Sequence, residues 1–164
     1  HRAVCAFRAR GHIRKIIHEI KYGHCPFLID DLVSIAVKDS LFRRHLAGSH
    51  LVPVPLHSTK LNERSYNQAE RIAQQLSRCV PSCICSNALI KIRPTLSQTL
   101  LNRTERRKNV AKSFLANPSV KISPNVRYVI VDDVLTTGAT LHACAVALRK
   151  AGAIHIDAAA LAHG

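Results

Sequence analysis

The sequence predicts an α/β domain of three layers, in which helices cover both faces of a mostly parallel central sheet. From residue 50 onward, short apolar runs typical of strands alternate with segments of helical periodicity, the order that a parallel sheet requires. A length of 164 residues, with 47% hydrophobic and 21% charged residues, suits one soluble globular domain. We therefore expect a single domain over residues 1–164, whose first part, residues 1–48, is helical.

The N-terminal part shows helical periodicity twice. Between Gly11 and Gly23, isoleucines recur with the spacing of an amphipathic helix, at Ile13, Ile16, Ile17 and Ile20. A longer pattern predicts a second helix over residues 27–46, whose apolar side is formed by Leu28, Leu32, Ile35, Phe42 and Leu46.

The pattern changes at residue 50. Residues 50–56 indicate a short strand, and two prolines place it at a strand end or an unusual turn. Ser65 and Gln68 have the spacing of a capping box, which predicts a helix that buries Tyr66, Ala69, Ile72, Ala73 and Leu76. A second strand is predicted over residues 84–92. The next stretch, 93–112, is polar and basic, with too few apolar residues for a core element.

The C-terminal third continues the alternation. Residues 127–131 predict a buried parallel strand that ends at two aspartates. A helix follows, closed by Gly152 and marked by Leu141, Cys144, Ala145 and Leu148. Residues 155–161 predict the last strand.

The charge balance is strongly basic, with 24 Lys and Arg against 10 Asp and Glu and a formal net charge of +14. Such a balance favours polyanionic partners, namely nucleic acid, acidic lipid or phosphorylated metabolites, although a merely solubilising basic surface is the alternative. Aromatic residues make up only 4% of the chain and Trp is absent, so few rings are available for stacking on single-stranded bases.

Six cysteines lie at positions 5, 25, 79, 83, 85 and 144 without the paired spacing of a zinc site. We expect buried thiols in a reducing compartment, and we predict no metal ligand in the chain. No stretch approaches the roughly 20 unbroken apolar residues of a membrane helix, and no signal peptide opens the sequence. We therefore expect a cytoplasmic protein that does not insert into membranes.

The most informative segment is the run from Tyr128 to Thr140, in which a buried strand, two carboxylates, a hydroxyl-and-glycine loop and a helix follow one another. The first N–H groups of a helix have no intrahelical partner, so the loop forms an anion cradle. Asp132 and Asp133 lie where an α/β sheet presents ligands, and vicinal ribose hydroxyls suit them better than a phosphate that they would repel. For the aspartates alone, the alternative is an ordinary Asp-rich turn with a Thr N-cap.

This segment closely resembles the motif with which type I phosphoribosyltransferases bind 5-phosphoribosyl-1-pyrophosphate (PRPP). The rest of the chain resembles the ComF family of competence proteins, through Ile20-Lys-Tyr-Gly23, Val52-Pro-Val-Pro-Leu56, Arg64-Ser-Tyr-Asn-Gln-Ala69, Arg93, Thr95, Gln98, Leu101, Arg106, Asn109 and Phe114. Ser65 departs from the family pattern, which usually has Gly there. ComF proteins typically begin with a cysteine-rich zinc module, which these residues do not contain.

The resemblance implies a phosphoribosyltransferase type I fold and assigns roles to four groups of residues. Asp132 and Asp133 are the catalytic pair at the ribose, and the 5-phosphate is bound by Thr136, Thr137, Gly138, Ala139 and Thr140. The pyrophosphate is bound by Leu56, His57, Ser58, Thr59 and Lys60, and an extended Pro-rich connection is the alternative for this segment. Residues 93–112 correspond to a flexible basic loop with Arg93, Thr95, Gln98, Arg103, Arg106, Arg107 and Lys108.

Two functions remain open. The first is a Mg²⁺-dependent transfer of the phosphoribosyl group from PRPP to an unknown acceptor, with release of pyrophosphate, in a protein of natural transformation and DNA uptake. The second is a non-catalytic, PRPP-regulated component that binds single-stranded DNA. Partner proteins of the uptake machinery are expected in either case, and catalytic turnover is less strongly implied than PRPP binding.

Overall fold

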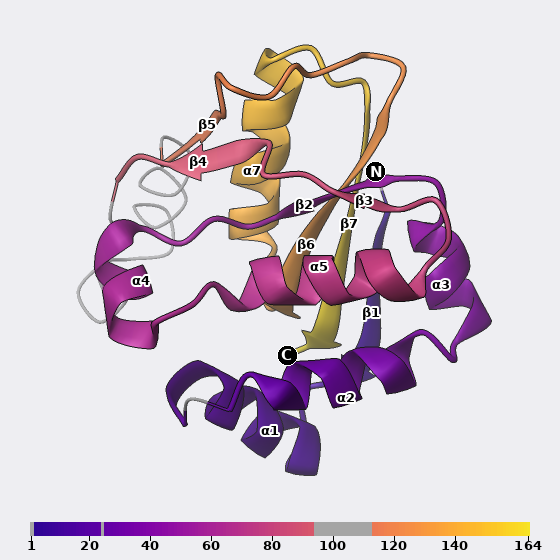
Figure 1. The fold of residues 1–164 in the computed structure, drawn as a ribbon, viewed down its shortest axis with the longest axis vertical. Helices are drawn as coiled ribbons and strands as arrows, with labels where there is room; N and C mark the ends of the chain where they lie inside the picture. Colours follow the sequence, from indigo (N-terminus) through magenta and orange to yellow (C-terminus); the bar gives the residue numbers. More distant parts are fainter. Residues whose placement is uncertain (1, 24, 94–112) are drawn as a thin grey trace.

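The structure is a computed structural model that describes residues 2–23, 25–93 and 113–164 (Figure 1). Its main sheet has the strand order β1-β7-β6-β2-β3, and all neighbouring strands are parallel. The strands are β1 (Ala3–Arg8), β2 (His50–Pro53), β3 (Ile84–Cys85), β6 (Arg127–Leu135) and β7 (His155–His163). A separate antiparallel pair joins β4 (Leu89–Lys91) to β5 (Phe114–Ala116). The predicted α/β fold with a mostly parallel sheet is confirmed.

The sheet separates two hydrophobic cores, because neighbouring residues of a strand project to opposite faces. Val129 and Val131 of β6 pack with helices α1 (Gly11–Tyr22), α2 (Phe27–Ala36), α3 (Ser40–Leu46) and α5 (Gln68–Cys79). Tyr128 and Ile130 pack on the other face with α7 (Ala139–Lys150) and the β4–β5 pair. The three-layer arrangement follows from this alternation (Figure 1).

The prediction of one long helix over residues 27–46 is wrong, since α2 and α3 are separate helices. The side chain of Asp39 accepts hydrogen bonds from the backbone N–H groups of Leu41 (2.8 Å) and Phe42 (3.1 Å), and so starts a new helix. The apolar periodicity runs across this break, because Phe42 and Leu46 enter the same core as α2. The spacing therefore gave no sign of the interruption, whereas the Asp39 cap was a local signal that we missed.

The predicted capping box at Ser65 is also wrong. Asn67 caps α5 instead, since its side-chain oxygen accepts a hydrogen bond of 3.1 Å from the N–H of Ala69. Ser65 adopts a left-handed conformation, with φ of 64°, and ends helix α4 (Ser58–Arg64), which the sequence did not predict. A left-handed C-terminal residue explains why glycine would suit this position.

The strands differ from the predictions in several places, beginning with β2, which ends at Pro53 and not at residue 56. The predicted strand over residues 84–92 is two strands of different sheets, divided by a turn in which the N–H of Ala88 donates to the carbonyl of Ser86 (2.8 Å). β6 continues through both aspartates to Leu135, and β7 continues to His163. β1 and β5 were not predicted, so the N-terminal part contains a strand besides its helices.

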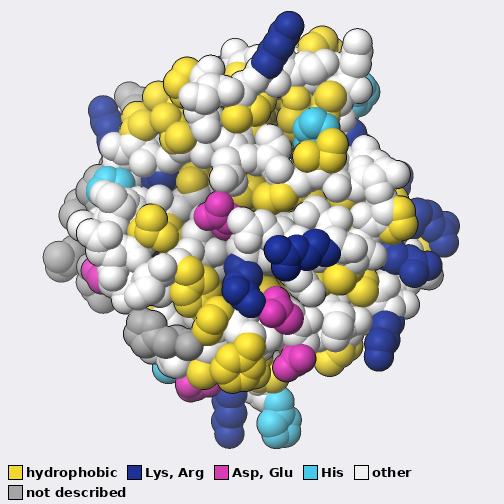
Figure 2. Space-filling model, in the orientation of Figure 1, with side chains coloured by type: hydrophobic (Ala, Val, Ile, Leu, Met, Phe, Trp, Pro, Cys, Tyr) yellow, Lys and Arg dark blue, Asp and Glu magenta, His cyan; other side chains and the backbone are white. Residues whose placement is uncertain are grey.

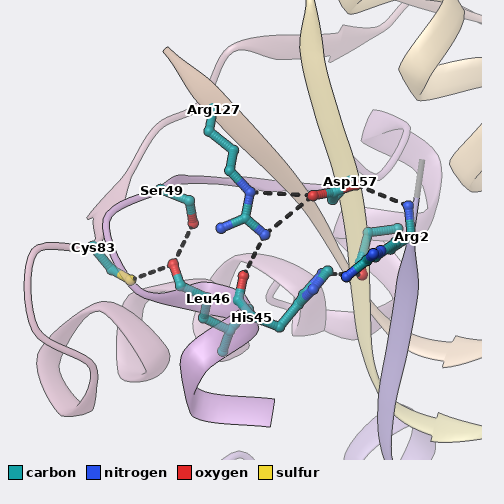
Figure 3. A network of polar contacts seen from close by, with 8 residues as sticks. Arg2, His45, Leu46, Ser49, Cys83, Arg127 and Asp157 are labelled. Carbon is teal, nitrogen blue, oxygen red and sulfur yellow. Dashed lines mark hydrogen bonds and ion pairs between the residues drawn. The ribbon is translucent and has the colours of Figure 1, made fainter. Parts of the chain in front are cut away.

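A polar network ties α3 to the amino ends of the strands (Figure 3). The Arg127 guanidinium donates to the carboxylate of Asp157, with Nε 3.1 Å from Oδ2, and to the carbonyl of His45, with Nη2 2.6 Å from the oxygen. The next carbonyl, that of Leu46, accepts hydrogen bonds from the Ser49 hydroxyl (2.6 Å) and the Cys83 thiol (3.0 Å). These contacts satisfy carbonyls at the helix end that would otherwise lack partners.

The six cysteines are free thiols, and of them only Cys144 is buried. Cys79 is exposed and the other four are partly buried, which corrects the expectation of buried thiols for five of the six. Within residues 2–23, 25–93 and 113–164, no helix combines the length and apolarity needed to cross a bilayer.

Candidate functional site

The site lies where two neighbouring parallel strands end at different heights. β2 pairs with β6 from His50 opposite Tyr128 to Pro53 opposite Val131, and the N–H of Val54 still donates to the carbonyl of Val131 (2.9 Å). Beyond that point β6 continues alone beside β7. The two aspartates of β6 and the segment after β2 therefore meet at one edge of the sheet, where α/β proteins bind ligands.

Asp132 and Asp133 have different surroundings. Asp133 lies in an ion pair with Lys21, at the end of α1, with 3.0 Å between Oδ2 and Nζ. Asp132 is partly buried on the α7 side, where its Oδ1 accepts a hydrogen bond of 2.9 Å from the N–H of Asp133. The two side chains project to opposite faces of the sheet, because adjacent residues of an extended strand alternate between its faces. The aspartates were expected just after the strand, but they lie within β6, which continues to Leu135.

The electrostatics of the pair are unequal. Burial, with the nearby charge of Asp133 as the second cause, raises the pKa of Asp132 from 3.8 to about 7. The positive charges of Lys21 and Lys91 act in the opposite direction and only partly compensate. Beneath Asp132, burial raises the pKa of the Cys144 thiol, which is therefore a neutral core group.

Lys91 brings a further cation to the site from β4. Its ammonium lies 5.2 Å from the ring centroid of Phe114, and burial followed by the charge of Lys60 lowers its pKa. Lys91 and Lys60 thus lie close enough to influence each other, although they come from different elements. A polyanion that bound between them would relieve their repulsion.

The segment after β6 forms a turn into α7. Thr136 and Thr137 are exposed, and Gly138 has φ of +72°, a left-handed conformation that favours glycine. Ala139 and Thr140 are the first residues of α7, which has no acidic residue in its first turn. The N–H of Ala139 reaches only the Thr137 hydroxyl, at 3.5 Å, so the helix start lacks a strong side-chain cap. Threonine hydroxyls, an open glycine and helix N–H groups thus lie together, as an anion cradle requires.

The segment from Leu56 to Lys60 is only partly a loop. His57 is the N-cap of α4, and its Nδ1 lies 2.6 Å from the Thr59 hydroxyl. Ser58, Thr59 and Lys60 form the first turn of that helix, which corrects the picture of an extended connection. Ser58 and Thr59 are exposed, so their hydroxyls are accessible at this edge.

Of the predicted basic loop, the structure describes only the exposed Arg93. Thr95, Gln98, Arg103, Arg106, Arg107 and Lys108 lie outside the described residues. Two lysines at the site were missed by sequence reasoning. Lys21 belongs to the Ile20-Lys-Tyr-Gly23 run that we noticed without assigning it a role, whereas nothing in the sequence marked Lys91.

Comparison with known proteins agrees with the fold and motifs. Residues 62–164 match the phosphoribosyl transferase domain family. Competence protein F of Haemophilus influenzae is 35% identical over 132 residues, which are 80% of this chain and 58% of that protein. DNA utilization protein YhgH of Escherichia coli K12 is 30% identical over 146 residues, 87% of this chain and 63% of that protein. Competence protein ComFC of Bacillus subtilis is 34% identical over 102 residues, 62% of this chain and 39% of that protein. The chain spans about three fifths of the length of the first two relatives.

Proposed function

Because the chain belongs to the phosphoribosyl transferase domain family and to its ComF branch, we propose that it binds PRPP with Mg²⁺ at the edge of the sheet between β2 and β6. One observation carries the proposal: the run from Asp132 to Thr140 and the segment from Leu56 to Lys60 lie at the carboxyl ends of the adjacent parallel strands β6 and β2. Two anion-binding segments with carboxylates between them suit a ribose that bears phosphates at both ends.

In this proposal each part of PRPP has its own contacts. The 5-phosphate binds the hydroxyls of Thr136, Thr137 and Thr140 and the N–H groups at the start of α7, where Gly138 leaves the backbone accessible. The ribose hydroxyls donate to Asp132 and Asp133. The pyrophosphate lies against Ser58, Thr59 and Lys60, and Lys91 adds positive charge nearby.

In this proposal Mg²⁺ binds together with PRPP. It is held mainly by PRPP's own oxygens and water, since Mg²⁺ gives up its waters reluctantly. The two carboxylates beside the pyrophosphate segment favour a cation there, so the residues present are compatible with the ion. When bound, Mg²⁺ neutralises the charge that the departing pyrophosphate gains.

The reaction that this pocket supports is transfer of the phosphoribosyl group. The bond between ribose C1 and the pyrophosphate oxygen breaks, and pyrophosphate leaves with the electron pair. The acceptor's nucleophilic atom forms the new bond to C1 through a transition state of oxocarbenium character. The protein contributes by holding both ends of PRPP, by placing cations at the leaving group and by excluding water. The acceptor is an open part of the proposal.

Calorimetric titration with PRPP and Mg²⁺ tests the binding. The parent protein should bind, and the Asp132→Ala/Asp133→Ala variant should bind at least about tenfold more weakly, because it lacks both ribose acceptors. Asp31→Ala, which removes an exposed aspartate of α2, is the matched control. Equal affinity in all three proteins would show that the ribose contacts are misassigned. Thermal denaturation of each protein separates lost binding from lost folding.

Turnover is measured separately, as pyrophosphate released from PRPP in the presence of candidate acceptors. Release that depends on both an acceptor and Asp132 with Asp133 supports the transferase. Tight PRPP binding without release for any acceptor favours a regulatory role for PRPP.

We also propose a cytoplasmic role in competence and DNA uptake, with direct binding of single-stranded DNA and contacts to uptake proteins as the second candidate function. The observation that supports this second function is the net charge of +14. Several exposed basic residues contribute to it near the carboxyl ends of the strands, namely Arg8, Arg10, Arg14 and Lys15. On the face drawn in Figure 2, basic side chains are spread out and acidic ones lie among them, so that face offers no continuous basic track.

A titration of labelled single-stranded DNA at several salt concentrations tests this second function. Backbone phosphate contacts predict an affinity that falls steeply as salt rises. Absence of binding at low salt would exclude direct DNA binding, whereas unaltered binding in the Asp132→Ala/Asp133→Ala variant would place the DNA outside the PRPP pocket.

A further inference from the structure

The last turn of α1 reaches the site through Lys21. Its ammonium lies 3.0 Å from Asp133 Oδ2, and the two side chains are only 25% and 12% exposed. An ion pair with so little water around it is screened far less than a surface pair, and its partners are strongly oriented by each other. Lys21 lies more than a hundred residues before Asp133 in the chain, so this contact exists only in the folded protein.

The residues on both sides of Lys21 contact the end of α4 and the segment that follows it. The Tyr66 hydroxyl donates to the carbonyl of Ile20, whose own side chain is buried in the core. The Arg64 guanidinium lies over the Tyr22 ring, 5.2 Å from its centroid, and donates to the Tyr22 hydroxyl over 3.4 Å. Lys21 is therefore presented to Asp133 by the same segment that follows the pyrophosphate-binding residues.

The charged groups around the two aspartates differ by face. Asp133 contacts Lys21 of α1, and Asp132 is its neighbour in the same strand. Asp132 is approached by Lys91 of β4, with Lys60 of α4 beyond it, and packs near the neutral thiol of Cys144 on α7. Lys21 therefore contacts Asp133 directly and orients its carboxylate.

We propose that Lys21 is a positioning residue of the phosphoribosyl pocket, which orients the Asp133 carboxylate as an acceptor for a ribose hydroxyl. This inference rests on the proposed PRPP site. It distinguishes the two aspartates by their neighbours: Asp133 is held by an ion pair with Lys21 of α1, whereas Asp132 lies on the α7 side of the sheet. In this proposal the Ile20-Lys-Tyr-Gly23 and Arg64-Ser-Tyr-Asn-Gln-Ala69 runs act together, since contacts between them hold Lys21 beside Asp133.

The test uses Lys21→Met, which keeps much of the side chain's apolar length without its charge, and Lys21→Arg, which keeps the charge. Lys15→Met, at an exposed position of the same helix, is the control. PRPP affinity with Mg²⁺ is measured by calorimetry near neutral pH. We expect Lys21→Met to bind about tenfold more weakly than the parent, because the Asp133 carboxylate loses the contact that orients it. Lys21→Arg should restore most of the affinity, and Lys15→Met should match the parent.

Two probes separate positioning from a general loss of positive charge. Ribose 5-phosphate, which contains the ribose hydroxyls, should bind Lys21→Met more weakly than it binds the parent. Inorganic pyrophosphate with Mg²⁺ should bind both proteins equally. Equal weakening of both probes would show that Lys21 acts only as a distant charge and would overturn the positioning role.

A measurement without PRPP distinguishes failure of this inference from failure of the proposed function. Carbon-13 labelling of the aspartate carboxyls lets NMR report the surroundings of each carboxyl in the free protein. The Asp133 carboxyl signal should shift in Lys21→Met, because its ion-pair partner is removed, and should be unchanged in Lys15→Met. An unchanged Asp133 signal in Lys21→Met would overturn the inference even if PRPP binds. If PRPP fails to bind the parent, the ribose role falls while the ion-pair effect is still measured.

Discussion

Asn67 joins the end of β2 to the start of α5 by two hydrogen bonds of its side chain. Its amide nitrogen lies 3.1 Å from the Val54 carbonyl oxygen, and its amide oxygen accepts from the N–H of Ala69 over 3.1 Å. One residue thus caps a helix and fixes the exit of the strand that leads to the pyrophosphate segment. This is a physical reason for asparagine within the Arg64-Ser-Tyr-Asn-Gln-Ala69 run.

Asn67→Ala should lower the free energy of unfolding by about 1–2 kcal/mol, because it removes a helix cap and leaves the Val54 carbonyl without this donor. PRPP affinity should fall as well, since the segment after Val54 loses its anchor. Urea denaturation measures the first effect and calorimetry the second. Gln74→Ala, an exposed substitution on the same helix, should leave both unchanged. A similar loss in both variants would contradict the role of Asn67.

The raised pKa of Asp132 predicts that the stability of the protein decreases as pH rises toward neutral. Its pKa is raised from 3.8 to about 7, first by burial and second by Asp133, so between these values the folded protein holds a proton that the unfolded chain has lost. The contribution of Asp132 to stability is therefore greatest at low pH, decreases as pH rises to about 7 and is constant above. Asp132→Asn removes this loss and should raise the free energy of unfolding at about pH 8 by at least about 1 kcal/mol.

Denaturation curves at about pH 4 and about pH 8 check this prediction, because the gain should be confined to the higher pH. Asp31→Asn is the control for a general change in net charge, and it should give the same small effect at both values. A gain of equal size at both pH values would show that removing the Asp132 charge is not its cause.

Thr137 is exposed in the turn before α7, so a large side chain there should block phosphate without disturbing the core. We expect Thr137→Tyr to reduce PRPP affinity by about a hundredfold, through steric exclusion and the loss of a hydroxyl donor. The melting temperature should stay close to that of the parent. Gln74→Tyr, which adds the same ring to an exposed position of α5, should bind PRPP normally. Normal binding by Thr137→Tyr would place the 5-phosphate elsewhere.

Arg127 supports the fold at the opposite edge of the sheet (Figure 3). Arg127→Met removes its hydrogen bonds to Asp157 and to the His45 carbonyl, and should lower the free energy of unfolding by about 2 kcal/mol. Burial raises the pKa of Asp157, but the Arg2 N–H and Arg127 outweigh it and hold this pKa below its ordinary value. That stabilisation is present above the ordinary pKa and is lost as pH falls through the lowered one.

The difference between Arg127→Met and the parent should therefore shrink in acid, which denaturation at about pH 3 and about pH 7 measures. PRPP affinity at neutral pH should be unchanged while the variant remains folded. Arg78→Met, an exposed substitution at the end of α5, is the control. A pH-independent difference would mean that Asp157 is not the partner that matters.

Several features were accessible from the sequence because they depend on neighbours in the chain. The periodicity of Ile13, Ile16 and Ile20 predicted α1, and the apolar run at 127–131 predicted the buried part of β6. The order of strand, carboxylates, loop and helix from Tyr128 to Thr140 predicted the nature of the site without any knowledge of the sheet. Local errors arose where two signals competed, as at Ser65, whose capping spacing concealed the cap formed by Asn67.

The sequence by itself determined the α/β class and placed two adjacent carboxylates before a Thr-rich turn, and it predicted the two anion-binding segments, since each pattern lies within a few consecutive residues. Only the tertiary structure decided that Lys21 and Lys91 lie beside those carboxylates, because α1 and β4 reach the edge of the sheet through packing between distant segments. It also decided the raised pKa of Asp132, because burial is the first cause of that shift, ahead of the charge of Asp133, and burial depends on which elements pack around β6.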